Sequence, residues 1–522
     1  MRMTLKLIGK TNIFNLLLVA PLVFLCTMTL LVSCKDNHEE KKDAKTEKPN
    51  LLYIFPDQLR NASIGINNQD PVYTPNMDQL AKEGILLSNA IANFPLCSPS
   101  RAMLMTGKLP YNNSVLTNAN SKRYEFNNSW QKDDVSFSDV LVKNGYDAGY
   151  VGKLHLTSPP PIAGKDSVIW DAYTPKEDRH GFNFWYAYGT YDEHNNPHYW
   201  VNDAKENELK YVHEWSPKHE ADVIIDYIKN QNNTLRDSKK PFALFWSVNP
   251  PHPPYQYVPE KYLEHYNDKT LEELLVRKNV DLETDAEDLA FHNGATRGRV
   301  NLAREHVRNH FAMVTGVDEQ IGRVLKALKE QGLHKNTIVV ISSDHGEMMG
   351  SHGLMSKNIW FEESVNVPFI IRWPEKIKAG QKSNLLLGTP DIMPTILNML
   401  GATDGIPSDL DGKDLSSTIL TGKGEKPESA LYYFIEQGRP ESGHRGIRTL
   451  ENTYVITVDD TGQVRKFLYD NINDPYQKVN LIETSTQIEQ KLHSKLLKTL
   501  EEKNDPWLDR YTSLETPENN IN

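Results

Sequence analysis

Four short apolar runs, separated by stretches with helical spacing, constrain the fold of this 522-residue chain more than any other feature. The runs cover residues 50–55, 146–152, 241–248 and 337–341, and the clearest helical stretches cover 135–144 and 311–331. Apolar strands that alternate with helices predict a mainly parallel sheet that is covered on both faces. In open α/β sheets, ligands bind beyond the carboxyl ends of the strands. Polar side chains that follow the four runs are therefore expected to meet at one edge of the sheet.

Polar residues that suit a shared site follow each of the four runs. They are Asp57 and Gln58 after the first run, Lys153 and His155 after the second, His252 after the third, and Asp344 and His345 after the fourth. A polar turn after a strand is common, so none of these residues is informative alone. Their repetition after every run favours one converging site, in which His155 and His252 can move protons near neutral pH.

Three of these side chains offer oxygen ligands for a metal ion. Asp57 and Asp344 carry carboxylates, and Gln58 carries an amide oxygen. A site built mostly from oxygen favours Ca²⁺ over Zn²⁺, with Mg²⁺ as the other hard cation to consider. His345 is a weaker ligand for such a cation, and a role as hydrogen-bond donor is its alternative.

A further chemical candidate is Cys97, which stands shortly before the helix-forming residues 102–105. Pro95 and Pro99 are expected to keep the chain extended, so that a short helix begins after them. Unpaired N–H groups and the helix dipole make such a position suitable for a nucleophile or an anion. Arg101, about one turn further on, can bring its guanidinium back toward Cys97. The alternative for an isolated cysteine is a buried thiol in the core.

The sequence pattern of the N-terminal segment predicts that the protein is exported. Residues 13–32 carry no charge and are almost wholly apolar, and residues 31–34 (LVSC) resemble a bacterial lipobox. This pattern predicts a lipoprotein signal peptide over 1–33, with cleavage before Cys34 and lipid attachment to it. The charged stretch 34–49 is predicted to be a disordered tether. A transmembrane anchor is the alternative, since about 20 apolar residues span a bilayer. Both alternatives place the rest of the chain outside the cytoplasm, in the periplasm or at the outer membrane and cell surface.

Cysteine usage agrees with a special role for one residue. The three cysteines are Cys26, Cys34 and Cys97, and the first two fall in the predicted leader and lipid anchor. The mature chain would then hold no internal disulfide, and an unpaired cysteine in an exported protein calls for an explanation. Conversion of the Cys97 thiol to another group would supply one.

The pattern Cys97-x-Pro99-x-Arg101 resembles the modification sequence of the type I sulfatases, a family of the alkaline phosphatase superfamily. Further motifs resemble the family in the same order: Asp57-Gln58, Lys153-x-His155, His252 among prolines, Asp344-His345, and Lys357 downstream. The family usually has a second Asp where Gln58 stands, and many members have Asn where His345 stands. These departures bear on metal affinity rather than on the class of reaction.

The resemblance implies an α/β fold, an alkaline-phosphatase-like α/β/α sandwich with a large, mainly parallel mixed sheet, over residues 50–415. It also implies a small C-terminal α+β subdomain with an antiparallel sheet over residues 416–522. Short strands are expected there at 444–448, 454–458 and 466–469, followed by a helix at 488–502.

The resemblance further implies that a separate maturation enzyme oxidises Cys97 to formylglycine (3-oxoalanine). Hydrated to a gem-diol, this residue would contact the metal and attack the sulfur of a sulfate ester. The metal, Ca²⁺ or Mg²⁺, would be held by Asp57, Gln58, Cys97, Asp344 and His345.

Six residues would then carry the reaction: Cys97, Arg101, Lys153, His155, His252 and Lys357. Arg101 would orient the diol. Lys153 and Lys357 would hold the sulfate oxygens. His252 would protonate the leaving sugar oxygen, and His155 would help to remove the proton from the second hydroxyl as sulfate is expelled.

The substrate implied is a sulfated carbohydrate, such as a glycosaminoglycan, mucin or algal glycan fragment. Residues 158–200 are rich in proline, histidine and aromatic residues, and we expect them to form an irregular insertion that walls a binding site. His180, His194 and His198 are the candidates there for substrate binding, and a packed surface loop is the alternative. A net charge of −11 argues against binding to nucleic acid.

Two other functions remain open from the sequence. One is a phosphoester or phosphonate ester hydrolase of the same superfamily. The other is a glycan-binding surface lipoprotein that has lost catalysis, although the intact set of polar residues argues against it.

Overall fold

The computed structural model describes residues 48–283 and 303–515 of the chain. The predicted leader, Cys34 with its predicted lipid anchor, and nearly all of the predicted tether therefore lie outside the described residues. Within the described ranges, no helix is long and apolar enough to cross a membrane.

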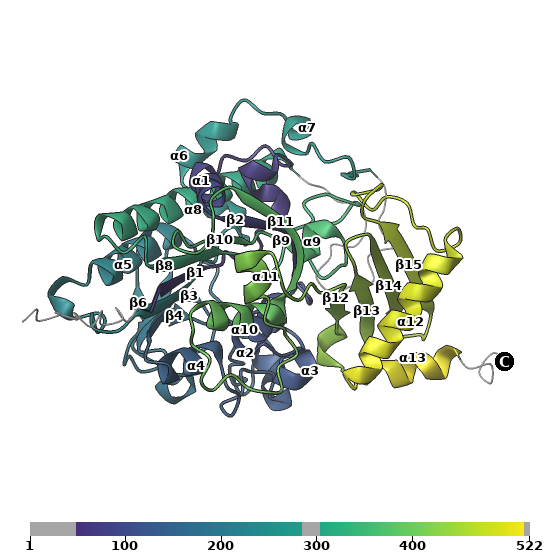
Figure 1. Cartoon of the computed structure of the whole chain (residues 1–522), viewed down its shortest axis with the longest axis horizontal. Helices are drawn as coiled ribbons and strands as arrows, with labels where there is room; N and C mark the ends of the chain where they lie inside the picture. Colours follow the sequence, from purple (N-terminus) through teal and green to yellow (C-terminus); the bar gives the residue numbers. More distant parts are fainter. Residues whose placement is uncertain (1–47, 284–302, 516–522) are drawn as a thin grey trace, which may run out of the picture. The chain divides into compact units, whose positions relative to one another are not determined.

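A large mixed sheet forms the centre of the fold (Figure 1). In chain order its strands are β1 (Asn50–Ile54), β2 (Ile85–Ile91), β3 (Asp147–Lys153), β4 (Phe184–Tyr188), β5 (His198–Val201), β6 (Lys210–Tyr211), β7 (Phe242–Ser247), β8 (Thr337–Ile341), β9 (Asn366–Val367), β10 (Ile370–Arg372) and β11 (Gln381–Gly388). They lie in the order β11-β2-β10-β8-β1-β7-β3-β4-β5-β6, with β9 paired to β2.

The four strands predicted from the apolar runs are neighbours in this sheet. β8, β1, β7 and β3 lie side by side, and each of their pairings is parallel. Leu52 of β1, for example, is in register with Val339 of β8 and Leu244 of β7. The carboxyl ends of these strands therefore share one edge of the sheet, as predicted.

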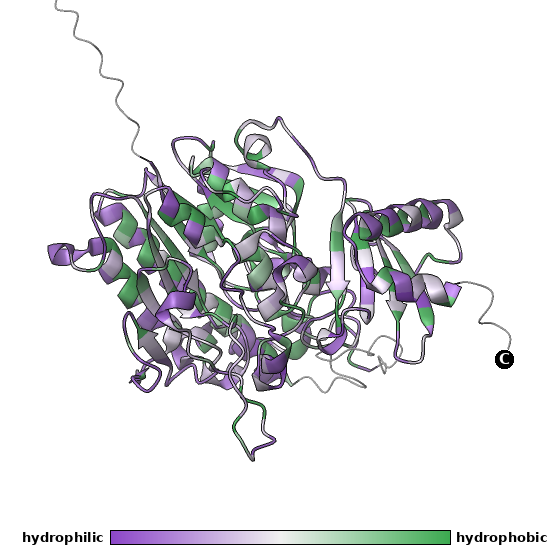
Figure 2. Ribbon diagram, turned by 90° about the horizontal axis from the view of Figure 1, so that it is seen from below, coloured by the Kyte–Doolittle hydropathy of each residue, from purple (hydrophilic) through white to green (hydrophobic). Residues whose placement is uncertain are grey.

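Helices cover both faces of the sheet, and the expected α/β/α sandwich is confirmed. One face carries α1 (Pro75–Glu83), α5 (Ser216–Lys229) and α8 (Arg304–Glu330), and the other carries α2 (Cys97–Thr106), α4 (Phe137–Lys143), α10 (Thr389–Met399) and α11 (Ser416–Thr421). Leu52 and Ile54 of β1 pack on the α8 side, whereas Leu51 and Tyr53 pack on the α2 side. In Figure 2 the strands are largely green and the helices alternate green and purple, because each helix turns its apolar side to the sheet.

Short helices lie in the connections. They are α3 (Pro110–Asn113), α6 (Glu260–Leu263), α7 (Leu271–Leu274) and α9 (Glu362–Val365), and the 3₁₀ turns η1 (Asn61–Ser63), η2 (Gly65–Asn67), η3 (Ser121–Phe126), η4 (Lys176–Asp178), η5 (Gln231–Asn233), η6 (Tyr255–Tyr257), η7 (Glu264–Tyr266) and η8 (Glu436–Gly438). The long helix predicted at 311–331 is α8, which begins earlier, at Arg304.

A second, antiparallel sheet follows, as expected for the C-terminal region. Its strands are β12 (Ala430–Phe434), β13 (Gly443–Arg448), β14 (Asn452–Val458) and β15 (Val464–Asp470), and α12 (Thr486–Glu502) and α13 (Trp507–Glu515) come after them. The sequence did not predict β12 or α13. β12 joins the two sheets, because the Tyr433 N–H donates to the Asn93 carbonyl at 2.7 Å and the Asn93 amide donates to the Leu431 carbonyl at 2.7 Å. The boundary at 415/416 stays a prediction.

The expectation of an irregular insertion over 158–200 is wrong for two parts of that segment. Phe184–Tyr188 forms β4 and His198–Val201 forms β5, both within the large sheet. Trp185 and Tyr186 are buried there. Aromatic residues have high strand propensity because they pack well on a pleated surface, and this preference prevailed over the loop-like composition.

A buried acid, Glu220 of α5, lies beneath the sheet. Trp246 Nε1 donates to Glu220 Oε2 at 2.9 Å, and the Tyr199 hydroxyl donates to Oε1 at 3.1 Å. Burial raises the pKa of Glu220 from 4.5 to about 8, although both hydrogen bonds oppose the shift. The side chain is therefore uncharged at neutral pH.

We predict that Glu220→Gln flattens the pH dependence of folding. The folded-state pKa lies above the unfolded value, so unfolding releases a proton between pH 4.5 and about 8, and stability falls as pH rises through this window. Each pH unit in the window changes the free energy of unfolding by about 1.4 kcal/mol. Urea unfolding at pH 5 and pH 8 should show a smaller loss in the Gln variant than in the native protein. Glu501→Gln, on the exposed side of α12, is the matched control, and parallel curves for Glu220→Gln and the native protein would contradict the prediction.

Candidate active site

The helix that carries Cys97 starts earlier than the sequence predicted. Helix α2 begins at Cys97 itself, with Leu96 as its N-cap, so the expectation that Pro99 precedes the helix is wrong. Proline is tolerated in the first turn because its missing N–H would have no intrahelical partner there. The Cys97 side chain consequently occupies the first position of the helix, and it is 1% exposed.

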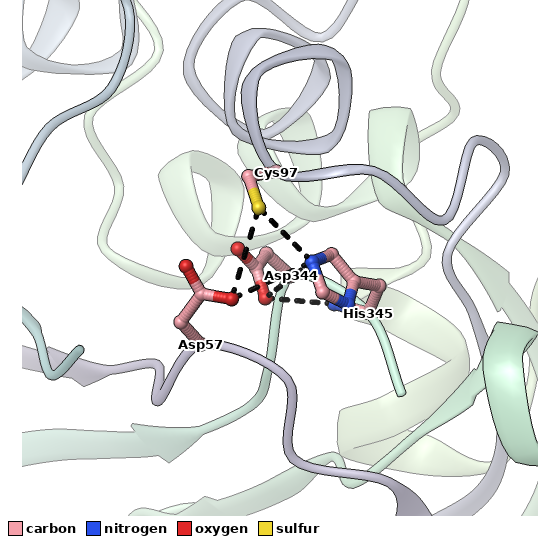
Figure 3. A group of neighbouring side chains, drawn as sticks. All are labelled: Asp57, Cys97, Asp344 and His345. Carbon is pink, nitrogen blue, oxygen red and sulfur yellow. Dashed lines mark hydrogen bonds and ion pairs between the residues drawn. The ribbon is translucent and has the colours of Figure 1, made fainter. Parts of the chain in front are cut away.

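Four side chains from three separate segments point toward one centre (Figure 3). They are Asp57 from the loop after β1, Cys97 from the start of α2, and Asp344 and His345 from the loop after β8, and one ligand atom of each lies within 4.8 Å of the others. Cys97 Sγ is 3.3 Å from His345 Nε2 and 3.8 Å from Asp57 Oδ1. The predicted convergence of these residues is therefore observed.

His345 is oriented by its second ring nitrogen. Nδ1 lies 3.0 Å from the Gly346 carbonyl, so Nδ1 carries the proton that is donated to this oxygen. In the neutral ring, Nε2 then directs its lone pair at the centre, 3.5 Å from Asp57 Oδ1 and 3.7 Å from Asp344 Oδ1. Two carboxylates and an imidazole nitrogen held in this way fit a divalent cation.

Arg101 ties the centre to the sheet. Its guanidinium pairs with Asp57 Oδ2 at 3.1 Å and with Asp344 Oδ2 at 2.9 Å. It also donates to the Lys153 carbonyl at 2.9 Å and to Ser247 Oγ at 2.6 Å. One buried side chain thus connects the ends of all four central strands.

Lys153 provides a second buried positive charge. Its ammonium lies 2.7 Å from Asp57 Oδ2 and donates to Asn249 Oδ1 at 3.2 Å. Burial opposes this charge, but Asp57 and Cys97 raise the pKa of Lys153 above its usual value. The residue before Lys153 must be glycine, because β3 and β7 approach closely there. Gly152 has φ +99°, and a Cβ at this position would stand 2.1 Å from the Ser247 carbonyl oxygen.

Lys357 is connected to the site by a hydrogen bond to the side-chain amide of Gln58. Its ammonium donates to Gln58 Oε1 at 2.5 Å, and Gln58 Nε2 donates to the buried carboxyl of Glu347. Burial raises the pKa of Glu347. Both ends of the Gln58 amide are therefore engaged, so metal ligation by Gln58 requires the same oxygen to accept the cation as well as Lys357, and it stays a prediction.

The surrounding charges act strongly on Cys97. Burial and Asp57 would raise the pKa of the thiol, but Lys357, His345 and Lys153 together hold it well below its usual value. A negatively charged or electron-rich group is accordingly stabilised at position 97, as expected at the start of a helix.

His252 follows β7 and lies near the same positive charges. Burial and Lys153 lower the pKa of His252 to about 3, against the opposing effect of Asp192, whose Oδ1 is 3.5 Å from His252 Nδ1. The ring is therefore neutral near pH 7. His194 lies beside it, because His194 Nε2 donates to the His252 carbonyl at 2.8 Å.

The remaining predicted histidines differ in their surroundings. His155 Nε2 donates to the Ala119 carbonyl at 3.2 Å, and its buried Nδ1 has no hydrogen-bond partner among the described residues. His180 Nδ1 lies 2.8 Å from Asp139 of α4, and His198 Nε2 lies 2.7 Å from Asp171. These two pairs belong to the packing of the scaffold rather than to the cluster around Cys97, and the binding of substrate by His180 and His198 stays a prediction.

Four residues of the site were not singled out from the sequence: Ser247, Asn249, Asp192 and Glu347. Ser247 and Asn249 end the β7 run and occupy the position at which the other strands carry polar residues, so that pattern could have found them. Glu347 stands two residues after His345. Asp192 carries no such signal, because its role comes from its contact with Asn249 at 3.0 Å.

Comparison with known proteins agrees with this site. The family model described as Sulfatase matches residues 49–402, and the one described as N-sulphoglucosamine sulphohydrolase, C-terminal, matches residues 350–504. The chain is 40% identical to an endo-4-O-sulfatase of Bacteroides thetaiotaomicron, over 92% of this chain and 97% of that protein. It is 34% identical to an ulvan-active sulfatase of Formosa agariphila, over 94% of this chain and 89% of that protein.

A solved structure gives the same result. A protein described with the metabolism of multiple glycosaminoglycans by Bacteroides thetaiotaomicron has a TM-score of 0.79 at 40% identity, and the match covers 90% of this chain and 98% of that one. The chain therefore belongs to the sulfatase family of the alkaline phosphatase superfamily, and it is a sulfuric ester hydrolase.

Proposed function

We propose that the protein removes sulfate from a sulfated glycan, after a maturation enzyme has oxidised Cys97 to formylglycine. The observation that carries this proposal is the position of Cys97, at the start of α2 and aimed into the cluster of Asp57, Asp344 and His345. Lys153 and Lys357 lower the pKa of the Cys97 thiol and so supply positive charge around its side chain. Formylglycine supplies, in its hydrated form, an oxygen nucleophile and a second hydroxyl that allows sulfate to leave.

We propose Ca²⁺ as the resident cation, with Mg²⁺ as the alternative. Asp57, Asp344 and His345 would hold it, and two carboxylates would balance its charge. When bound, a divalent cation supplies positive charge that acidifies the hydroxyl at position 97 and polarises a sulfate oxygen.

The other residues of the chain would bind the ester and move protons. Lys357 and Lys153 would hold the sulfate oxygens, and Arg101 would keep the side chain at position 97 in place. His252 needs a proton before it can act as the acid. A bound sulfate ester adds negative charge beside Lys153, which offsets one cause of the low pKa of His252. His155 would take a proton through Nδ1, which has no hydrogen-bond partner in the part of the chain that the structure describes.

A carbohydrate substrate is supported by the relatives. The endo-4-O-sulfatase and the ulvan-active sulfatase are named for activity on sulfated glycans, and both match the chain over nearly its whole length.

From the predicted leader we also propose that the protein is exported and held by lipid at Cys34, in the periplasm or at the cell surface.

We predict that Cys97→Ala lowers turnover of an aryl sulfate at least about a thousandfold, because the nucleophile is absent. Cys97→Ser should behave in the same way unless the maturation enzyme accepts serine. Mass spectrometry of the active enzyme should find an aldehyde at position 97. Full turnover by a preparation that carries the intact thiol would refute the mechanism, and faster hydrolysis of aryl phosphate than of aryl sulfate would assign the protein to the phosphoester hydrolases.

We predict that removal of Ca²⁺ with a chelator stops turnover and that added Ca²⁺ restores it. Independently of activity, Ca²⁺ should raise the melting temperature, since a ligand at 100 times its Kd stabilises the folded state by about 2.7 kcal/mol. Asp344→Asn should abolish this shift, because one carboxylate charge is lost. Asp226→Asn on the exposed side of α5 is the matched control. An equal shift in the native protein and in Asp344→Asn would show that the cation binds elsewhere.

A further inference from the structure

A cavity of about 320 Å³ opens beside Lys357, at the side of the cluster around Cys97. Its wall comes from several distant parts of the chain, which include Leu96 before α2 and Lys357 before α9. Asn118, Asn120 and Arg123 come from the segment after α3, Trp170 from the segment between β3 and β4, and Gln437 from the turn after β12. We call this cavity the Arg123 pocket. Its volume lies at the lower end of the range for sites that bind small ligands.

Arg123 places a positive charge in this pocket. Within the described ranges, no ion pair joins Arg123 to a carboxylate, and its guanidinium has a single long hydrogen bond, 3.5 Å from Nη2 to Gln437 Oε1. Burial without an opposing charge lowers the pKa of Arg123. The neighbouring Arg439 differs, because it pairs with Asp460 at 2.7 Å and with Glu436 at 3.3 Å.

Lys357 places a second positive charge in the same pocket. In the part of the chain that the structure describes, its ammonium has an amide partner, Gln58, and no carboxylate within ion-pair distance. Within the described ranges, the pocket therefore presents two positive side chains that form no ion pair with a carboxylate, on a protein whose net charge is −11. Such a local arrangement selects ligands with more than one negative charge.

The rest of the wall suits a sugar. Trp170 is 44% exposed, and its ring lies 6.1 Å from the ring of His155 in an edge-to-face arrangement. An exposed aromatic face next to the catalytic residues offers apolar surface to a sugar ring. Asn118 adds an amide nitrogen that can donate to a hydroxyl, while its Oδ1 already accepts from the Ser98 N–H at 3.0 Å.

We propose that the Arg123 pocket binds the sugar around the scissile sulfate ester, and that Arg123 binds a second anionic group of the same glycan. This inference rests on the proposed function and deepens it. The group is a carboxylate or a further sulfate, since either accepts two parallel hydrogen bonds from a guanidinium. Lys357 then serves the ester that is cleaved, while Arg123 selects acidic glycans over neutral ones that carry a single sulfate.

The test compares matched substrates with the active holoenzyme and its variants. The first pair consists of a sulfated disaccharide that contains a uronic acid and the same disaccharide with its carboxyl group reduced. The second pair consists of a disaccharide with one sulfate and the same disaccharide with one additional sulfate. Arg123→Gln should raise KM about 10- to 100-fold for the substrate with the second anion, while the loss on its partner stays below about threefold. Arg123→Lys should lie between the two enzymes, since it keeps the charge and loses the planar fork.

Arg439→Gln is the matched control, because it removes a nearby guanidinium that is already paired, and it should leave both substrate ratios unchanged. If Arg123→Gln changes the KM ratio of the first pair, the group that Arg123 binds is the carboxylate; if it changes the ratio of the second pair, the group is the additional sulfate. Equal losses on both members of each pair, or no loss on any substrate, would overturn the role of Arg123.

Binding separates this inference from the proposed function. Titration of the substrates into Cys97→Ala measures affinity without turnover, and Cys97→Ala/Arg123→Gln should bind the doubly anionic glycan about 10- to 100-fold more weakly than Cys97→Ala. If the native enzyme with verified formylglycine hydrolyses no sulfate ester, the proposed function fails, whereas an Arg123-dependent affinity would still support the pocket. Equal affinity of the two variants would overturn the pocket whatever the activity.

Discussion

The buried guanidinium of Arg101 is the interaction on which the site depends. Asp57 and Asp344 are both buried and lie close together. Two buried carboxylates repel each other, and the desolvation penalty of each is large unless it is paired. Arg101 contacts both at 3.1 Å and 2.9 Å, and so pairs both carboxylates and holds them in position. The same side chain lies one helical turn from Cys97. Cys97, the two carboxylates and the edge of the sheet therefore form one connected unit.

The central strands were readable from the sequence for a physical reason. A parallel strand that is covered on both faces must be apolar along its length, so β1, β3, β7 and β8 appear as continuous runs whose ends are polar. Other strands lack this signature. β11 opens with Gln381, Lys382 and Ser383, and β4 and β5 lie in a segment with the composition of a loop. The start of α2 was misplaced because Pro99 was read as a barrier, although the first turn accepts it.

Residues of the site could be predicted from the sequence only where the chemistry of their side chains, or a motif, singled them out. Carboxylates and the Cys97 motif carry their own signal, whereas Asp192 acts through a contact that only the folded chain creates. The amide of Gln58 shows the opposite limit, because an oxygen that suits a metal is engaged by Lys357 in the folded protein. His180 and His198 were candidates by residue type, but each lies beside a carboxylate of the scaffold.

The origin of the wall beside Lys357 has a further consequence. The cluster around Cys97 comes from the start of α2 and from the loops after the parallel strands β1 and β8, whereas Gln437 comes from a turn of the small C-terminal sheet and Trp170 from the segment between β3 and β4. With the roles proposed above, reactivity and selectivity would be encoded in separate stretches of polypeptide. A relative with the same buried charges around Arg101 would then accept a different glycan after changes in a few residues of one turn.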